Sequence, residues 1–170
     1  MPRACVGTTI PSYYGVRTAL NLFQASTRLW WDDECSGFDL LTSLEAIEEK
    51  QEGDPKMARL RVQLLQRAIQ LPMRDDVASL AQKLVAGGLI PDKGASEAIH
   101  IGVASVHRMD YIVTWNFKHI ANPFMRDRLR EMVYEAGFHL PVLCSPDELL
   151  QYNEDYGSVK PTQSLLKCVA

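Results

Sequence analysis

Residues 110–122 read DYIVTWNFKHIAN, a short apolar run that ends abruptly in polar side chains. A buried strand of a parallel sheet has this appearance, because both of its faces are covered and its polar residues begin where it ends. Open α/β sheets bind ligands in the crevice outside the carboxyl ends of their strands. We therefore expect a site at this strand end, with four candidate side chains: Thr114, Asn116, Lys118 and His119. An ordinary strand followed by a polar loop would have the same pattern.

The segment just before this strand predicts a buried helix. Residues 97–107 read EAIHIGVASVH, and a helix without a polar face is covered on all sides. Glu97 falls in its first turn, where the helix dipole favours a carboxylate, so we expect Glu97 to stay ionised at the rim of the core. His100, three residues after Glu97, lies on the same face of the expected helix as Glu97. On a buried helix a histidine is more often a hydrogen-bonded core residue than a ligand.

The order of elements predicts an α/β fold with a mainly parallel central sheet and helices on both faces. Strands are expected at 4–8, at 38–42, from 111 and at 142–144. Helices are expected before Trp30 and Trp31, after a capping box of Thr42 and Glu45, over 55–68, before the glycine pair 87–88, through 129–136, and after Ser145.

An acidic stripe is expected on the helix that follows the second strand. Four glutamates at i, i+3, i+4 and i+7 share one face: Glu45, Glu48, Glu49 and Glu52. Such a stripe is usually solvated. Alternatively, one of these side chains turns into the crevice as a metal ligand, and Mg²⁺ needs only one or two protein carboxylates.

Composition indicates one intracellular domain. With 170 residues, 46% of them hydrophobic, the chain is long enough for one sizeable core. No run approaches the roughly 20 apolar residues of a membrane span, and the first residues lack the apolar segment of a secretory signal. We expect a cytoplasmic protein without a membrane partner, with a domain over 1–151 and a tail over 152–170. The four cysteines are widely spaced, which indicates reduced thiols.

Charge is unevenly distributed along the chain. The net charge is −3, yet residues 107–130 hold five basic side chains against Asp110 and Asp127: Arg108, Lys118, Arg126, Arg128 and Arg130. A basic segment beside the expected site suits an approaching phosphate backbone. A solvated helix face would have the same composition.

Two motifs carry a resemblance to a known family. EAIHI at 97–101 and TWNFKHIAN at 114–122 resemble a branch of the PIN-domain nucleases related to VapC-type toxins, which shows an Asp-Ala-Leu-His helix and a Thr-Trp-Asn strand end. The resemblance extends over roughly residues 3–150, through TTIPSYY at 8–14, LTS at 41–43, Glu48 and Glu49, GDP at 53–55 and PDELL at 146–150. It implies a PIN-like three-layer fold.

The resemblance also implies a function, metal-dependent cleavage of RNA by carboxylates that hold Mg²⁺ or Mn²⁺. Carried over, the acidic positions are Gly7, Glu49, Glu97 and Asn116. We therefore expect Glu49, Glu97 and Asn116 as catalytic residues, with Glu49 and Glu97 as the metal ligands. Substrate contacts are expected from five further side chains: Thr8, Thr9, Ser12, Lys118 and His119. Family members also imply a homodimer and a cognate antitoxin as partners.

Gly7 departs from this pattern, because glycine can neither coordinate a cation nor orient a water. A second hypothesis follows: a catalytically degenerate PIN domain that binds RNA or an antitoxin without cutting. A nucleotide-binding module on a doubly wound sheet is disfavoured, since no G-x-G-x-x-G loop is present. For association we expect an aromatic surface that includes Phe23, Leu29, Trp30 and Trp31.

Overall fold

The protein is built around one parallel sheet. The computed structural model describes residues 1–15, 22–43, 46, 54–116 and 123–150. The described strands are β1 (Arg3–Val6), β2 (Asp39–Ser43), β3 (Ile69–Leu71), β4 (Tyr111–Val113) and β5 (Val142–Cys144). They lie in the order β3-β2-β1-β4-β5, and each neighbouring pair is parallel. The expected mainly parallel sheet is confirmed.

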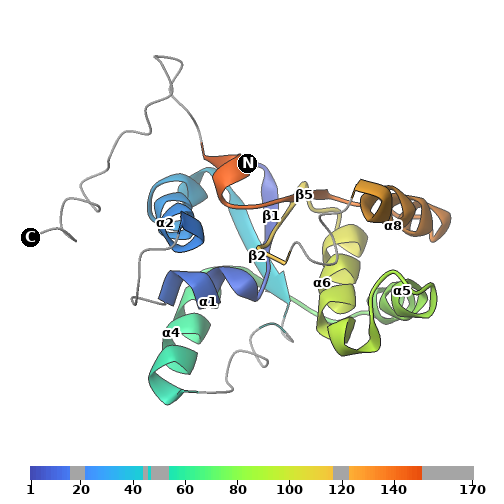
Figure 1. The fold of residues 1–170 in the computed structure, drawn as a ribbon, viewed down its shortest axis with the longest axis horizontal. Coiled ribbons are helices and arrows are strands. Elements are labelled where there is room, and N and C mark those ends of the chain that lie inside the picture. Colours follow the sequence, from blue (N-terminus) through green and yellow to red (C-terminus); the bar gives the residue numbers. More distant parts are fainter. Residues whose placement is uncertain (16–21, 44–45, 47–53, 117–122, 151–170) are drawn as a thin grey trace, which may run out of the picture.

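Helices cover both faces of the sheet. Figure 1 shows α1 (Thr9–Gly15), α2 (Leu22–Leu29) and α4 (Pro55–Leu65) on one side. On the other side lie α5 (Asp75–Ala86), α6 (Ala95–Val106) and α8 (Pro123–Glu135). Four shorter helical turns complete the described elements: η1 (Trp30–Glu34), η2 (Cys35–Gly37), η3 (Asp92–Gly94) and η4 (Asp147–Leu149). The result is the expected three-layer arrangement.

The core is divided between the two faces because successive strand residues point to opposite sides. Ala4 and Val6 of β1 pack with η1, α1 and α4, whereas Cys5 between them packs with α5 and α6. α6 is buried as the sequence predicts. Four of its side chains are at most 1% exposed: Ala98, Ile101, Val103 and Ala104. β1 thus anchors both halves of the core.

Trp30 and Trp31 are both fully buried, so the expectation that they belong to an association surface is wrong. They occupy a π-helical turn, whose wider geometry lets consecutive side chains both face apolar neighbours. Trp30 packs against Phe38 at a centroid distance of 5.9 Å, and Trp31 packs against Tyr14 at 6.2 Å. The two indoles also contact each other edge to face.

Three local elements differ from the sequence-based expectation. α4 ends at Leu65 instead of residue 68, and the chain then forms β3. Thr42 lies inside β2, where its hydroxyl donates to Val6 O at 3.3 Å, and Ser43 instead accepts the backbone N–H of Ala46 at 3.1 Å. Glu45 of the expected capping box lies outside the described residues. The expected helix after Ser145 is the single turn η4 within the described chain.

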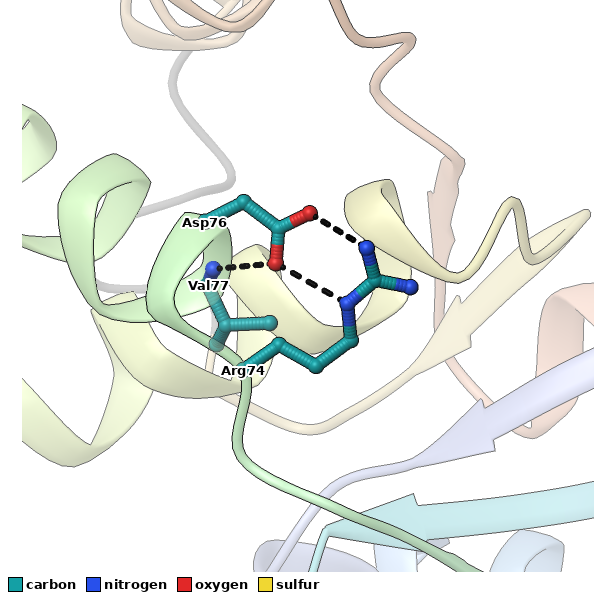
Figure 2. A network of polar contacts seen from close by, with 3 residues as sticks. All are labelled: Arg74, Asp76 and Val77. Carbon is teal, nitrogen blue, oxygen red and sulfur yellow. Dashed lines mark hydrogen bonds and ion pairs between the residues drawn. The ribbon is translucent and has the colours of Figure 1, made fainter.

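The start of α5 shows how a polar residue stabilises a helix end. Figure 2 shows Asp76 accepting two hydrogen bonds from the Arg74 guanidinium, at 3.1 and 2.9 Å, and one from the Val77 backbone N–H at 3.1 Å. The carboxylate therefore satisfies one of the first-turn N–H groups that lack a partner inside the helix. It also interacts favourably with the helix dipole.

The described cysteines agree with the expectation of reduced thiols: Cys5, Cys35 and Cys144 are free and buried, and Cys168 lies outside the described residues. Among the helices that the structure describes, none is both long and apolar enough to cross a membrane.

Candidate functional site

The topology determines where the sheet opens a crevice. β1 lies between β2 and β4, and it pairs with β4 through Val6 and Val113 at their carboxyl ends. From β1 the chain passes through α1 on one face of the sheet, whereas α8, which follows β4, lies on the other face. Adjacent strands whose connections leave to opposite sides form the switch point at which doubly wound sheets bind ligands.

A cavity of about 280 Å³ lies at this switch point. Its wall is formed by the two strand ends together with the first turns of α6 and the residues before them. The lining residues are Gly7, Thr8, Thr9, Lys93, Gly94, Ser96, Glu97, His100, Ile101, Ile112, Thr114 and Asn116. Most of them are polar, so the cavity suits a hydrated or charged ligand.

Hydroxyl groups tie the two strand ends together. The backbone N–H of Gly7 donates to Val113 O at 2.9 Å, which extends the β1–β4 pairing by one residue. Thr9 Oγ1 accepts the backbone N–H of Trp115 at 2.9 Å and shares a hydrogen bond with Thr114 Oγ1 at 3.2 Å. Thr114 Oγ1 in turn accepts the backbone N–H of Asn116 at 3.1 Å. This network holds Asn116 at the cavity.

Glu97 reaches the cavity from the first turn of α6. Both of its carboxylate oxygens are buried, and neither has a hydrogen-bond partner among the described residues. Burial raises the pKa of this carboxyl to about 7. The expectation that Glu97 stays firmly ionised is therefore wrong, because a helix dipole contributes only about 0.3–1 kcal/mol and does not offset the loss of hydration.

His100 lies one turn further along α6 and is buried. Its Nε2 is 3.6 Å from the Sγ of Cys5, and its Nδ1 is 4.0 Å from the same atom. Burial raises the pKa of the Cys5 thiol to about 12, so the sulfur keeps its proton and can donate it to the ring. The imidazole is thus partnered in the core, as expected for a buried histidine, while it also forms part of the cavity wall.

The structure brings five of the expected site residues to one cavity: Glu97, Asn116, Thr114, Thr8 and Thr9, with Gly7 beside them. Ser12 does not line it, because its hydroxyl donates to the carbonyl of Thr8 at 3.1 Å inside α1. Three expected residues lie outside the described residues: Glu49, Lys118 and His119. Lys93 and Ser96 line the cavity although the sequence analysis missed them. Lys93 lies just before α6 and Ser96 in its first turn, next to Glu97, and this position is the signal that could have identified them.

The donors on the cavity wall suit a hard cation only in part. Within the described ranges, no group of three His, Cys, Asp or Glu side chains could hold a metal ion. The carboxylate of Glu97 and the amide of Asn116 do offer oxygen donors of the kind that Mg²⁺ takes. The two partnerless oxygens of Glu97 would gain a partner from a bound cation.

Gly7 occupies a position with little room for a side chain. A Cβ added there would lie 3.1 Å from Val113 O and 3.3 Å from both Cβ and Oγ1 of Thr114. These contacts are closer than ordinary van der Waals distances, so a larger residue requires the β4 end to move by a few tenths of an ångström.

One residue of the basic segment, Arg108, lies away from the cavity. Arg108 precedes β4 and lines a separate cavity at the opposite end of that strand, together with Asp110 and His139. A three-residue strand separates it from the site by about 10 Å. Arg130 forms an exposed ion pair with Asp127 at 2.8 Å. For Arg108, the interpretation as part of a basic surface adjoining the site is wrong.

Comparison with known proteins supports the fold. No family model matches the chain, and no curated protein matches it. A chain of the crystal structure of VapBC2 from Rickettsia felis, bound to a DNA fragment from the promoter, superposes with a TM-score of 0.51. The match covers 84% of this chain and 97% of that chain. The fold is PIN-like. At 15% identity, this likeness establishes the architecture alone.

Proposed function

We propose that this protein is a metal-dependent endoribonuclease of the PIN, VapC-like type, weakened by Gly7. The observation that carries the proposal is the carboxylate of Glu97, which is buried in a polar cavity at the switch point of the sheet with no hydrogen-bond partner in the part of the chain that the structure describes. Burying an unpaired carboxylate costs free energy. A divalent cation in that cavity would offset this cost.

The proposed roles follow from position. Glu97, with Glu49 as the second carboxylate, would hold Mg²⁺ or Mn²⁺. When bound, the cation would activate water and offset charge on the phosphate. Asn116 would orient a water or the substrate through its amide, and its backbone is held by Thr114.

Side chains that line the cavity would bind the phosphate of the RNA. Thr8 and Thr9 offer hydroxyls, and Lys93, which is exposed at the start of α6, offers a positive charge. Lys118 and His119 are proposed as further RNA contacts on the strength of the sequence motif alone. A cognate antitoxin and a second copy of the chain remain proposed protein partners.

The alternative is a degenerate PIN domain that binds RNA or an antitoxin without cleaving it. The tight surroundings of Gly7 favour this alternative, because a side chain there would lie 3.1–3.3 Å from Val113 O and Thr114 and would require the β4 end to shift. Under this hypothesis Glu97 would still bind a cation weakly, and the hydroxyl groups would still bind a phosphate.

A cleavage assay separates the two functions. Single-stranded RNA is incubated with Mg²⁺ or Mn²⁺ and the native chain, Gly7→Asp, Gly7→Glu and Gly7→Ala. We expect slow, Mn²⁺-favoured cleavage by the native chain, since Mn²⁺ binds oxygen donors more tightly than Mg²⁺. The acidic variants should cleave faster, whereas Gly7→Ala reports the effect of crowding without a new charge.

The same assay is repeated with Glu97→Gln, which removes the charge of the proposed metal ligand. In the native and acidic backgrounds it should abolish cleavage and metal binding measured by calorimetry. If both acidic variants fold and bind Mn²⁺ but cleave no RNA, the enzyme hypothesis fails and the binding module stands. If the native chain cleaves well and Glu97→Gln cleaves equally well, the assignment of the site is wrong.

A further inference from the structure

Three aromatic side chains from three separate elements meet beside the cavity. Tyr13 comes from α1, Phe23 from α2 and Trp115 from the segment after β4. The ring centroids of Phe23 and Trp115 are 4.8 Å apart, those of Tyr13 and Trp115 are 6.0 Å apart, and those of Tyr13 and Phe23 are 6.1 Å apart. We call these three residues the aromatic cluster.

The aromatic cluster lies at the edge of the core, with Trp115 packed against it and Phe23 exposed to solvent. Phe23 is 44% exposed, and Tyr13 and Trp115 are only partly buried, whereas Trp30 and Trp31 are 0% exposed. The indole is nevertheless held in place, because its Nε1–H donates to Thr27 Oγ1. A rigid, solvent-accessible aromatic surface of this kind is uncommon on a protein without a binding partner.

The aromatic cluster adjoins the wall of the cavity. Trp115 is the residue between Thr114 and Asn116, which both line the cavity, and its backbone N–H is bound by Thr9 on the cavity wall. Tyr13 follows Thr9 by four residues in α1, so the two side chains are neighbours on one helix face. The aromatic cluster therefore adjoins residues of the cavity wall, although none of its three side chains lines the cavity itself.

We propose that the aromatic cluster stacks against a base of single-stranded RNA whose phosphate occupies the neighbouring polar cavity. This inference rests on the proposed function, which supplies the phosphate. Single-stranded nucleic acid presents a charged phosphate and an apolar base face side by side, and proteins bind the latter on aromatic rings. An apolar segment of a partner protein would use the rings but not the adjoining polar cavity, so RNA fits both halves of the surface.

The geometry implies tolerance for different bases. Phe23 and the Trp115 ring, whose only N–H is already bound to Thr27, offer no hydrogen bond to a base edge. Recognition by stacking depends on the π-face that every base has. The contact thus selects unpaired strands over duplexes, in which the bases are already stacked.

Trp115 itself reports on the contact. The chain has three tryptophans, and the other two are fully buried, so quenching of emission by an added strand arises at Trp115. The probe is a short single-stranded oligoribonucleotide, titrated with Ca²⁺ in place of Mg²⁺ to hold back cleavage. A matched series has one abasic residue at each position in turn. Trp115→Phe keeps a ring but should remove the quenching.

Phe23→Ala and Tyr13→Ala should weaken binding by about 5- to 100-fold, the range that loss of one stacked base covers. Phe23→Tyr and Tyr13→Phe keep the rings and should bind as the native chain does. Tyr134→Ala is the matched control, because Tyr134 is a 70% exposed aromatic residue on α8, outside the cavity lining. Circular dichroism verifies that each variant is folded, and fluorescence anisotropy of a labelled strand gives the affinity independently of Trp115.

One abasic position in the series should bind as weakly as the full strand binds to Phe23→Ala, and combining the two changes should cost no more than either alone. If all abasic strands and all ring deletions bind like the native pair, the stacking surface is refuted while the nuclease proposal stands. If no strand binds the native chain, both proposals fail. If the ring deletions leave RNA binding intact but disperse a dimer in light scattering, the aromatic cluster is a protein interface.

Discussion

The ionised carboxylate of Glu97, which the proposed function needs, lowers the stability of the folded protein. Burial raises its pKa from the ordinary value of 4.5 to about 7, so the folded protein retains a proton that the unfolded chain releases. Stability is thus fully present below the unfolded pKa and decreases as pH rises through the folded one. A bound cation would remove this penalty, because it favours the ionised form.

Glu97→Gln should therefore stabilise the metal-free protein in a pH-dependent way. At about pH 8 with a chelator, we expect a gain of about 2 kcal/mol in the free energy of unfolding, after allowance for the partial exposure of the side chain. At about pH 4 the gain should vanish, because the carboxyl is protonated in both states. Urea denaturation at both pH values tests this, and an equal gain at both would show that ionisation is not the cause.

Thr9 is the second residue whose removal has a defined cost. Thr9→Val keeps the shape but deprives the backbone N–H of Trp115 of its acceptor and breaks the contact with Thr114. We expect a loss of about 1 kcal/mol in the free energy of unfolding, the lower end of the cost of an unsatisfied donor, because this hydrogen bond is only partly buried. Thr9→Ser retains the hydroxyl and should lose much less. Equal losses in both variants would locate the effect in packing.

At the scale of elements, a long segment with a continuous apolar pattern can be predicted from the sequence, whereas a strand of three residues cannot. Residues 97–107 have a continuous apolar pattern, and both the helix and its burial are confirmed. The three-residue strand β3 (Ile69–Leu71) carries too few residues for an alternation to be visible, and it pairs only because β2 lies beside it. Trp30 and Trp31 are both buried in a π-helical turn, which the local sequence pattern does not predict.

The candidate site likewise has features that the sequence predicts and features that it does not. Strand ends and the first turn of α6 brought Glu97, Asn116, Thr8 and Thr9 to one cavity, as the sequence order suggests. The raised pKa of Glu97 depends on desolvation by residues distant in sequence, and the sequence analysis therefore expected the opposite ionisation. The position of Arg108 at the far end of β4 similarly depends on the direction of the strand and not on its charge.

The packing of α5 on α6 provides an element-scale prediction at Gly102. A Cβ there would lie 3.0 Å from Val77 O and 3.3 Å from Val77 Cγ1, so Gly102→Ala forces the two helices apart. Alanine gains about 1 kcal/mol in helix propensity, but overpacking costs about 1–3 kcal/mol. We expect a net loss in thermal denaturation. Ser79→Ala, at an exposed position of α5, measures propensity alone and should be neutral or slightly stabilising.

At the scale of the whole molecule, the two halves of the core share β1 and should unfold together. Leu84 is fully buried on the α5–α6 side, away from Trp30 and Trp31 on the other face. Leu84→Ala should cost about 2–5 kcal/mol. The urea midpoint followed by tryptophan emission should fall as far as the midpoint followed by circular dichroism. Separate midpoints would show that the faces unfold independently.

The switch point also sets a condition on when the site can exist during synthesis. The cavity wall comes from the residues after β1, near the start of the chain, from the start of α6, and from β4 and the residues after it, about a hundred positions after β1. A ribosome must therefore release β4 before Thr9 can bind Trp115 and Thr114. A growing chain that has formed only β1, β2 and β3 has neither Glu97 nor Asn116 in its cavity wall. If this protein cuts RNA, its architecture keeps the unfinished chain from cutting the message that encodes it.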